Sequence, residues 1–260
     1  MPLTLQFGRF RWSASWSMTV LTLFGVVLFI LLGRWQWHRA GEAETLQQAF
    51  LEGGGARLEL PRGSTAALPR YSGVQVRGRY DSLHQFLLDN MSHAGQPGYE
   101  VLTPLRLADG RILIVNRGWI PLTQSRRQLP DVSVSQTAGS EASGRLDNLP
   151  RPGIALGHAP PAKDSPWPKY TSFPTMADLS TALGQPLESQ QLLLDARAPS
   201  GYLRDWQPPG MSPAQHLSYA FQWWAFATLA LVLYGALNRR RLPAATPLVA
   251  AGPRAGGGRA

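Results

Sequence analysis

The chain is 260 residues long. It contains 26 glycines, 22 prolines and nine tryptophans but no cysteine, and only 16% of its residues are charged, against about 25% in a typical soluble domain. This composition excludes disulfides, thiolate metal sites and covalent c-type haem attachment, and it argues against an ordinary cytosolic enzyme, a coiled coil or a disordered chain. Seven of the 25 basic residues are arginines in residues 1–15 and 238–260, where there is no acidic residue. The rest of the chain then has 18 basic and 16 acidic residues. Because the positive charge is confined to the two ends, a nucleic-acid-binding surface is not expected.

The first predicted element is a transmembrane helix over residues 16–33, preceded by a cytoplasmic N-terminus of residues 1–15. Residues 12–33 carry no charge, and 20–32 are almost wholly apolar, which meets the roughly 20 residues that a membrane-spanning helix needs. A cleavable signal peptide is the alternative, but it is disfavoured because its apolar core is usually 7–15 residues long and a small-residue cleavage site follows it. Good helix formers continue to Phe50, so the helix is expected to extend outward and to end at Gly53-Gly54-Gly55.

Residues 34–215 are predicted to form a β-rich domain outside the cytoplasm, with an antiparallel sheet that is partly closed into a barrel. Alternating apolar residues or short apolar runs, with Asp109-Gly110 as a hairpin turn, predict strands over residues 74–77, 85–88, 101–107, 111–115 and 192–194. Residues 56–70 and the proline-rich residues 150–174 are expected to be loops. One short helix is expected at residues 176–183, ending at Gly184.

A second transmembrane helix is predicted over residues 216–237, followed by a basic cytoplasmic tail of residues 238–260. The fold class is therefore that of an α+β membrane protein, with two transmembrane helices flanking the β-rich domain. Because positively charged flanks stay on the cytoplasmic side, both termini are expected inside. The domain then lies in the periplasm, and the protein is a multi-pass protein of a bacterial inner membrane.

One face of the second helix carries the residues with the most chemical interest. Ser212 and Pro213 suit a helix start, and they place His216 in the first turn. Tyr219, Ala220 and Trp223 follow at i+3, i+4 and i+7, so His216 and Trp223 differ by only about 20° in direction. This face would suit a flat, hydrophobic ligand that bears iron, with His216 as axial ligand. The same residues would equally anchor the helix in the aromatic belt of the membrane interface.

The end of the first helix offers further candidates for binding. Arg34 and Arg39 could meet phospholipid headgroups or the carboxylates of a ligand, and His38 is a second candidate iron ligand. Arginines and tryptophans that anchor a helix at the interface explain the segment as well.

In the domain, Arg117 stands in an unusual run with Asn116, Gly118 and Trp119. It could pair with an acid, face a partner, or belong to a structural corner of the domain. No GxSxG, Walker, GxGxxG or HExxH motif is present. Catalysis is therefore not expected. The alternative hypothesis of a membrane-tethered hydrolase or sensor is supported only by the size of the domain.

Four blocks in order resemble the surfeit locus family of cytochrome c oxidase assembly factors. The resemblance spans roughly residues 20–240, and the blocks are Leu32-Gly33-Arg34-Trp35-Gln36 with Arg39, Pro97-Gly98-Tyr99-Glu100-Val101-Leu102-Thr103-Pro104, Val115-Asn116-Arg117-Gly118-Trp119-Ile120-Pro121, and His216-Leu217-Ser218-Tyr219-Ala220-Phe221-Gln222-Trp223. A lysine that members commonly carry shortly after the position of Arg39 is missing here, and the tail beyond Arg241 is individual to this chain.

The resemblance implies an assembly factor rather than an enzyme. It implies binding of haem a and its delivery to cytochrome c oxidase subunit I, with haem a synthase and the lipid bilayer as further partners. The expected haem-binding residues are His216, as axial ligand of the iron, together with Trp223, Tyr219 and Arg39. The alternative is a scaffold that stabilises an assembly intermediate of subunit I without touching haem.

Overall fold

The computed structural model describes residues 3–7, 10–53, 58–122, 129–134, 139–151 and 158–241. The chain divides into two compact units, one formed by residues 1–43 with 211–260 and the other by residues 44–210. The first unit contains two long apolar helices, and the second contains the β-rich domain. The predicted α+β fold class is confirmed.

The helices α1 (Trp16–Glu52) and α3 (Pro213–Leu237) are both long and apolar enough to cross a membrane. The predicted continuation of the first helix beyond its apolar run is confirmed, because α1 ends at Glu52. Gly53 follows it, and a Cβ atom there would lie 1.8 Å from the backbone oxygen of Tyr71. Only glycine allows the chain to approach that closely. Gly54 and Gly55 lie outside the described residues.

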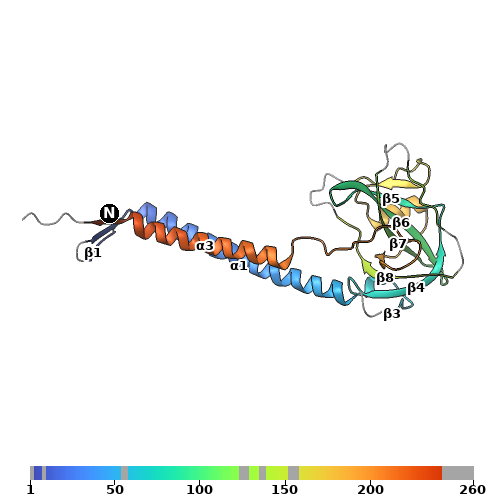
Figure 1. The fold of residues 1–260 in the computed structure, drawn as a ribbon, viewed down its shortest axis with the longest axis horizontal. Coiled ribbons are helices and arrows are strands. Elements are labelled where there is room, and N and C mark those ends of the chain that lie inside the picture. The colour runs from blue at the N-terminus through green and yellow to red at the C-terminus, as the bar shows by residue number, and fades with distance from the viewer. Residues whose placement is uncertain are drawn as a thin grey trace, which may run out of the picture. The chain divides into compact units, whose positions relative to one another are not determined.

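Within the first unit, α1 and α3 pack side by side and antiparallel (Figure 1). The hydroxyl oxygens of Thr19 and Tyr234 are 2.5 Å apart near one end of the pair, and Gln36 meets His216 near the other. Most buried positions where the two helices meet are occupied by small or apolar residues, namely Val26, Gly33 and Ala40 on α1 and Ala220 and Ala227 on α3, and His216 is the buried polar residue of α3. Small residues let two helix backbones approach closely, which is how helices associate when lipid surrounds them.

A small sheet that was not predicted joins the segment before α1 to the segment after α3. Strand β2 (Phe10–Ala14) pairs antiparallel with both β1 (Leu3–Phe7) and β11 (Arg239–Arg241). Neither end was predicted to contain a strand, although apolar residues alternate with polar ones over Leu3–Phe7 and Phe10–Ala14. The antiparallel helices bring the two ends together, and the amide of Ser13 donates to the backbone oxygen of Asn238 at 2.9 Å. Arg9 and residues 242–260 lie outside the described residues.

The domain is built on an eight-stranded sheet with the order β3-β4-β8-β10-β7-β6-β5-β9, and a further pairing of β4 with β6 closes part of it into a barrel. The strands are β3 (Leu58–Glu59), β4 (Gly73–Tyr80), β5 (Phe86–His93), β6 (Gln96–Leu107), β7 (Ile112–Pro121), β8 (Ser140–Asp147), β9 (Lys169–Thr171) and β10 (Gln191–Leu194). Most pairings are antiparallel, as predicted. The pairings β3–β4, β5–β9 and β7–β10 are parallel, so the sheet is mixed.

The predicted strands and the short helix are present, but three strands of the domain were missed: β8, and β3 and β9, which lie in the segments 56–70 and 150–174 that were expected to be loops. The helix α2 (Met176–Leu183) begins with a capping box between Thr175 and Asp178 and ends at Gly184 with φ +72°. The missed strands β8 and β9 carry few apolar residues. In β8 only Ala142 and Leu146 are buried hydrophobic residues, and Gly144 lets the backbone of Leu193 pass close by. The expected loop over 56–70 contains β3 and a single 3₁₀ turn (Thr65–Ala67).

The core of the domain lies on both faces of the sheet. One cluster joins inward-facing residues of the partly closed barrel, among them Val74, Leu113 and Leu192. A second cluster packs the opposite face of the sheet against α2 through residues that include Ile114 and Leu179. Because both faces of the central strands are buried, these strands form a rigid frame for the polar residues described below.

Candidate functional site

The start of α3 is fixed by its own side chains. The amide of Gln215 donates to Ser212 Oγ at 3.3 Å, and the amide of Ser212 donates to Gln215 Oε1 at 2.9 Å. Pro213 occupies the first turn. These contacts satisfy backbone amides that a helix start would otherwise leave without partners, and they place His216 in the first turn, as the sequence predicted.

The imidazole of His216 is held by α1. Its Nδ1 atom lies 2.8 Å from Gln36 Oε1, and only 9% of the residue is exposed. An amide oxygen can only accept, so Nδ1 carries a proton, and in the neutral tautomer the lone pair is then on Nε2. No described residue forms a hydrogen bond with Nε2. Nε2 is nevertheless absent from the side-chain atoms that are fully enclosed without a partner, so part of this atom is accessible. Nε2 is therefore the ring nitrogen that could ligate a metal.

The other residues of this face pack against the neighbouring helix. Ala220 is fully buried, and the ring of Trp223 stacks on Phe29 of α1 with centroids 5.8 Å apart and planes 22° apart. The sequence correctly grouped His216, Ala220 and Trp223 on one face, but it did not show that α1 packs on that face. Ala220 therefore leaves no space for a macrocycle, and one face of Trp223 is covered. Tyr219 is 44% exposed and offers open aromatic surface beside His216.

The charged residues that follow on α1 are exposed. Arg39 Nη1 is 2.5 Å from Glu42 Oε2, and both side chains are more than half exposed. None of the contacts in the described part of the chain joins Arg39 to His216. Arg34 and His38 are exposed as well, and Arg34 has no ion-pair partner among the described residues.

Arg117 is a structural residue of the domain core. It is 3% exposed, and its guanidinium donates to the backbone oxygens of Ser200 (2.6 Å) and Val132 (2.9 Å) and to Gln85 Oε1 (3.1 Å). Among the residues that the structure describes, no carboxylate pairs with it. Of the three alternatives drawn from the sequence, the structural corner is the one present, because the surrounding carbonyl oxygens replace an acid. Burial lowers the pKa of Arg117.

The same corner holds the chain segment that leads towards α3. The backbone of Arg117 accepts from the Tyr202 amide at 2.7 Å, and the Trp119 amide donates to the Leu203 oxygen at 2.7 Å. Gly118 between them has φ +110°, and a Cβ atom there would lie 2.6 Å from the Leu203 oxygen. Glycine is required at this position for both reasons.

Glu100 is a residue of interest that the sequence did not point out. Asn116 Nδ2 donates to Glu100 Oε2 at 2.7 Å, and Asn116 also lies 3.3 Å from Gln191 Oε1. Burial raises the pKa of Glu100, and the nearby carboxylate of Asp147 raises it further. Asp147 is paired with Arg70 at 2.5 Å, whereas Glu100 has no ion-pair partner in the described ranges. The only signal in the sequence was its place in the block from Pro97 to Pro104.

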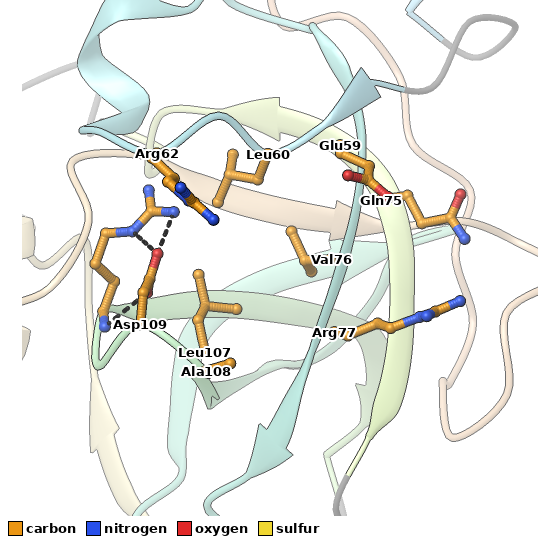
Figure 2. A pocket seen from close by; sticks show the side chains of 10 residues that line it. Glu59, Leu60, Arg62, Gln75, Val76, Arg77, Leu107, Ala108 and Asp109 are labelled. Atoms are coloured by element: carbon orange, nitrogen blue, oxygen red, sulfur yellow. Dashed lines mark hydrogen bonds and ion pairs between the residues drawn. The ribbon is translucent and has the colours of Figure 1, made fainter.

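The domain surface has a cleft of about 490 Å³ along β4, between β3 and the end of β6 (Figure 2). Leu60, Val76 and Leu107 provide its apolar lining. Arg111 lines it too and is held by Asp109 at 2.7 Å and by Glu188 at 3.3 Å. Among the described residues that line the cleft there is no histidine, serine, threonine or lysine, so these residues offer no nucleophile with an adjacent base.

A second cavity, of about 580 Å³, contains hydroxyl and imidazole groups that are used structurally. His158 Nε2 and Thr175 Oγ1 both contact Asp178 Oδ2, at 2.9 and 2.7 Å. The hydroxyl of Thr175 therefore points to the carboxylate that caps α2 and not to the imidazole. In the described parts of the chain, no group of three or more His, Asp or Glu side chains could hold a metal ion.

Two apolar helices that flank a mixed β-domain, with an imidazole held at the helix pair, indicate a membrane protein. The sequence model of the SURF1 family matches residues 23–228, and the chain belongs to this family, which is associated with cytochrome c oxidase assembly. A SURF1-like protein of Monosiga brevicollis is 28% identical over 237 residues, covering 80% of this chain and 83% of the relative. A SURF1-like protein of Rickettsia bellii (strain RML369-C) is 25% identical over 240 residues, covering 86% and 90%.

Proposed function

We propose that this protein assists cytochrome c oxidase assembly by binding haem a through His216 and releasing it to oxidase subunit I, at the outer edge of a bacterial inner membrane. The observation that carries this proposal is the hydrogen bond of His216 Nδ1 to Gln36, which leaves Nε2 as a neutral nitrogen donor. Neutral imidazole is a common axial ligand of haem iron.

The donor set fits haem as a cargo. One imidazole with an open Nε2 can occupy one axial position of the iron, and the described residues place no second ligand opposite it. Tyr219 and the exposed apolar side chains of both helices suit the macrocycle and its apolar tail. Trp223 contributes by packing on Phe29 and so supporting the helix pair. A propionate that approached Arg39 would compete with Glu42 for the guanidinium.

The test is a visible spectrum of protein purified in detergent from a host that makes haem a. We expect an a-type Soret band, in the oxidised and in the dithionite-reduced protein, that is lost for the most part in His216→Ala. His38→Ala removes an exposed histidine of α1 and should keep the band. Far-ultraviolet circular dichroism establishes that both variants are folded. Equal haem loading in wild type and His216→Ala would overturn the assignment.

The scaffold function is the second candidate, and the burial of His216 between the helices favours it. In that function the ring serves only as a helix contact, and haem a synthase and subunit I are bound without haem. A colourless protein that still pulls down subunit I, equally well in wild type and His216→Ala, would establish this alternative.

A further inference from the structure

Gln36 is a polar side chain within an apolar helix contact. Gln36 is itself half-buried, the buried positions next to it on α1 are Gly33 and Ala40, and Ala220 is the buried residue one turn after His216 on α3. A hydrogen bond is stronger in such surroundings than in water, and a polar group left without a partner there is costly. The Gln36–His216 bond is therefore the interaction that decides how the imidazole is oriented and which nitrogen carries its proton.

We propose that Gln36 is a positioning residue that fixes the tautomer of His216 and, because its amide is neutral, keeps the imidazole a weak ligand that can give up its haem. This inference rests on the proposed function. In this proposal Gln36 sets how tightly His216 binds the haem and how readily the haem is released.

The chemistry follows from the acceptor at Nδ1. Histidines that bind metals almost always donate their other N–H to an acceptor, which fixes the tautomer and raises the basicity of the ring. A carboxylate acceptor pulls more strongly on that proton than a neutral amide does. Glutamine thus supplies the orientation with little gain in basicity, as a carrier requires.

A second polar contact between the two helices provides a control, because it tests whether the Gln36–His216 bond serves only to hold the helices together. The contact of Thr19 with Tyr234 also joins α1 to α3 through polar side chains. It lies 17 residues from Gln36 along α1, or about 25 Å at 1.5 Å per residue. Tyr234→Phe removes a helix–helix hydrogen bond without touching His216, and Gln222→Leu removes an exposed glutamine of α3.

The first experiment needs no haem. Nitrogen-15 chemical shifts of the histidine rings in the full chain, in detergent micelles, report which nitrogen carries the proton, and His216→Ala identifies the signals. We expect His216 to be protonated at Nδ1 in wild type, Tyr234→Phe and Gln222→Leu, and to become a mixture of tautomers in Gln36→Leu. A proton on Nε2 in wild type, or an unchanged spectrum in Gln36→Leu, would overturn the proposal.

The second experiment uses haem-loaded protein at pH 8 and apomyoglobin as acceptor. We expect Gln36→Glu to lower the midpoint potential of the bound haem and to slow its transfer several-fold, and Gln36→Leu to lower haem occupancy. Tyr234→Phe should behave as wild type. If both Gln36 variants match Tyr234→Phe, the positioning role is wrong. If wild type takes up no haem, the proposed function fails and the role of Gln36 with it, although the ring spectra would still establish the hydrogen bond.

Discussion

At the scale of single residues, polar groups that are removed from water differ in the partners that compensate for their lost hydration. Arg117 is surrounded by three oxygen acceptors, and His216 has one amide. Asp81 is bound by Arg106 and by His84, and these contacts hold its pKa below the usual range although burial acts in the opposite direction. Glu100 has the amide of Asn116 and no cation among the described residues. Its protonation therefore bears directly on the stability of the domain.

We expect Glu100→Gln to stabilise the domain at neutral pH. Burial raises the pKa of Glu100 above its ordinary value of 4.5, so the folded state favours the protonated acid. The stability that this group contributes is fully present below its unfolded pKa and is lost as pH rises through its folded pKa. Glutamine keeps the shape and the hydrogen bond to Asn116 without ionising.

The measurement is thermal unfolding of the full chain in detergent between pH 4 and pH 8. Wild type should lose more stability over this range than Glu100→Gln, while the exposed Glu59 changed to Gln should follow wild type. Part of the dependence will persist in Glu100→Gln, because burial also raises the pKa of Asp147. Identical pH profiles of wild type and Glu100→Gln would contradict the prediction.

At the scale of elements, the contact between α1 and α3 depends on close packing around Gly33. A Cβ atom at Gly33 would lie 2.3 Å from Trp224 Nε1 and within 3 Å of two further atoms of that ring, whereas one at Gly25 meets nothing within 4 Å. Trp224 also packs against Trp37, with centroids 5.9 Å apart. Gly33 and Gly25, two of the three glycines of α1, thus form a matched pair of sites at which the effect of packing can be separated from the effect of helix propensity.

We predict that Gly33→Ala displaces Trp224 and weakens the helix pair, and that Gly25→Ala does not. Alanine favours a helix over glycine by about 1 kcal/mol, so Gly25→Ala should be neutral or stabilising. Near-ultraviolet circular dichroism of the tryptophans and thermal unfolding in detergent are the measurements. Equal spectra and equal stability for both variants would show that Trp224 moves aside without cost.

At the scale of the whole molecule, the chain is two units that are each stabilised internally. The domain has its own hydrophobic clusters on both faces of the sheet. Within it, the end of α1 is bound by Phe50, whose ring meets Tyr71 edge-on at 5.1 Å and lies under the guanidinium of Arg145 at 4.5 Å. The segment around Tyr202 is bound to Arg117.

A fragment of residues 44–210 is therefore expected to fold without the membrane helices. It should be soluble in the absence of detergent, give a β-rich circular dichroism spectrum and unfold cooperatively. A fragment of residues 44–197 lacks the segment bound to Arg117 and serves as the comparison, with a clearly lower midpoint of unfolding. An aggregated or unfolded 44–210 fragment would show that the domain needs the helices.

Local signals in the sequence were sufficient for much of the fold. An uncharged apolar run identified each long helix, the glycines after Phe50 marked the end of α1, and Asp109-Gly110 located the hairpin. The capping residues of α2 and α3 were also readable. All of these depend on residues within a few positions of each other, where propensity and periodicity act.

The sequence by itself determined the two apolar helices, the β-rich domain between them and the presence of an imidazole in the first turn of α3. Only the tertiary structure decided that α1 covers the face of α3 with Ala220 and Trp223, that Gln36 binds His216, and that carbonyl oxygens rather than an acid surround Arg117. It also decided the strands β8 and β9 and the sheet of β1, β2 and β11. The physical reason is that most of these features join residues far apart in the chain, and a partner chosen by packing leaves no local mark on either segment. The hairpin of β1 and β2 is the exception, because its strands are adjacent in sequence and alternate apolar with polar residues.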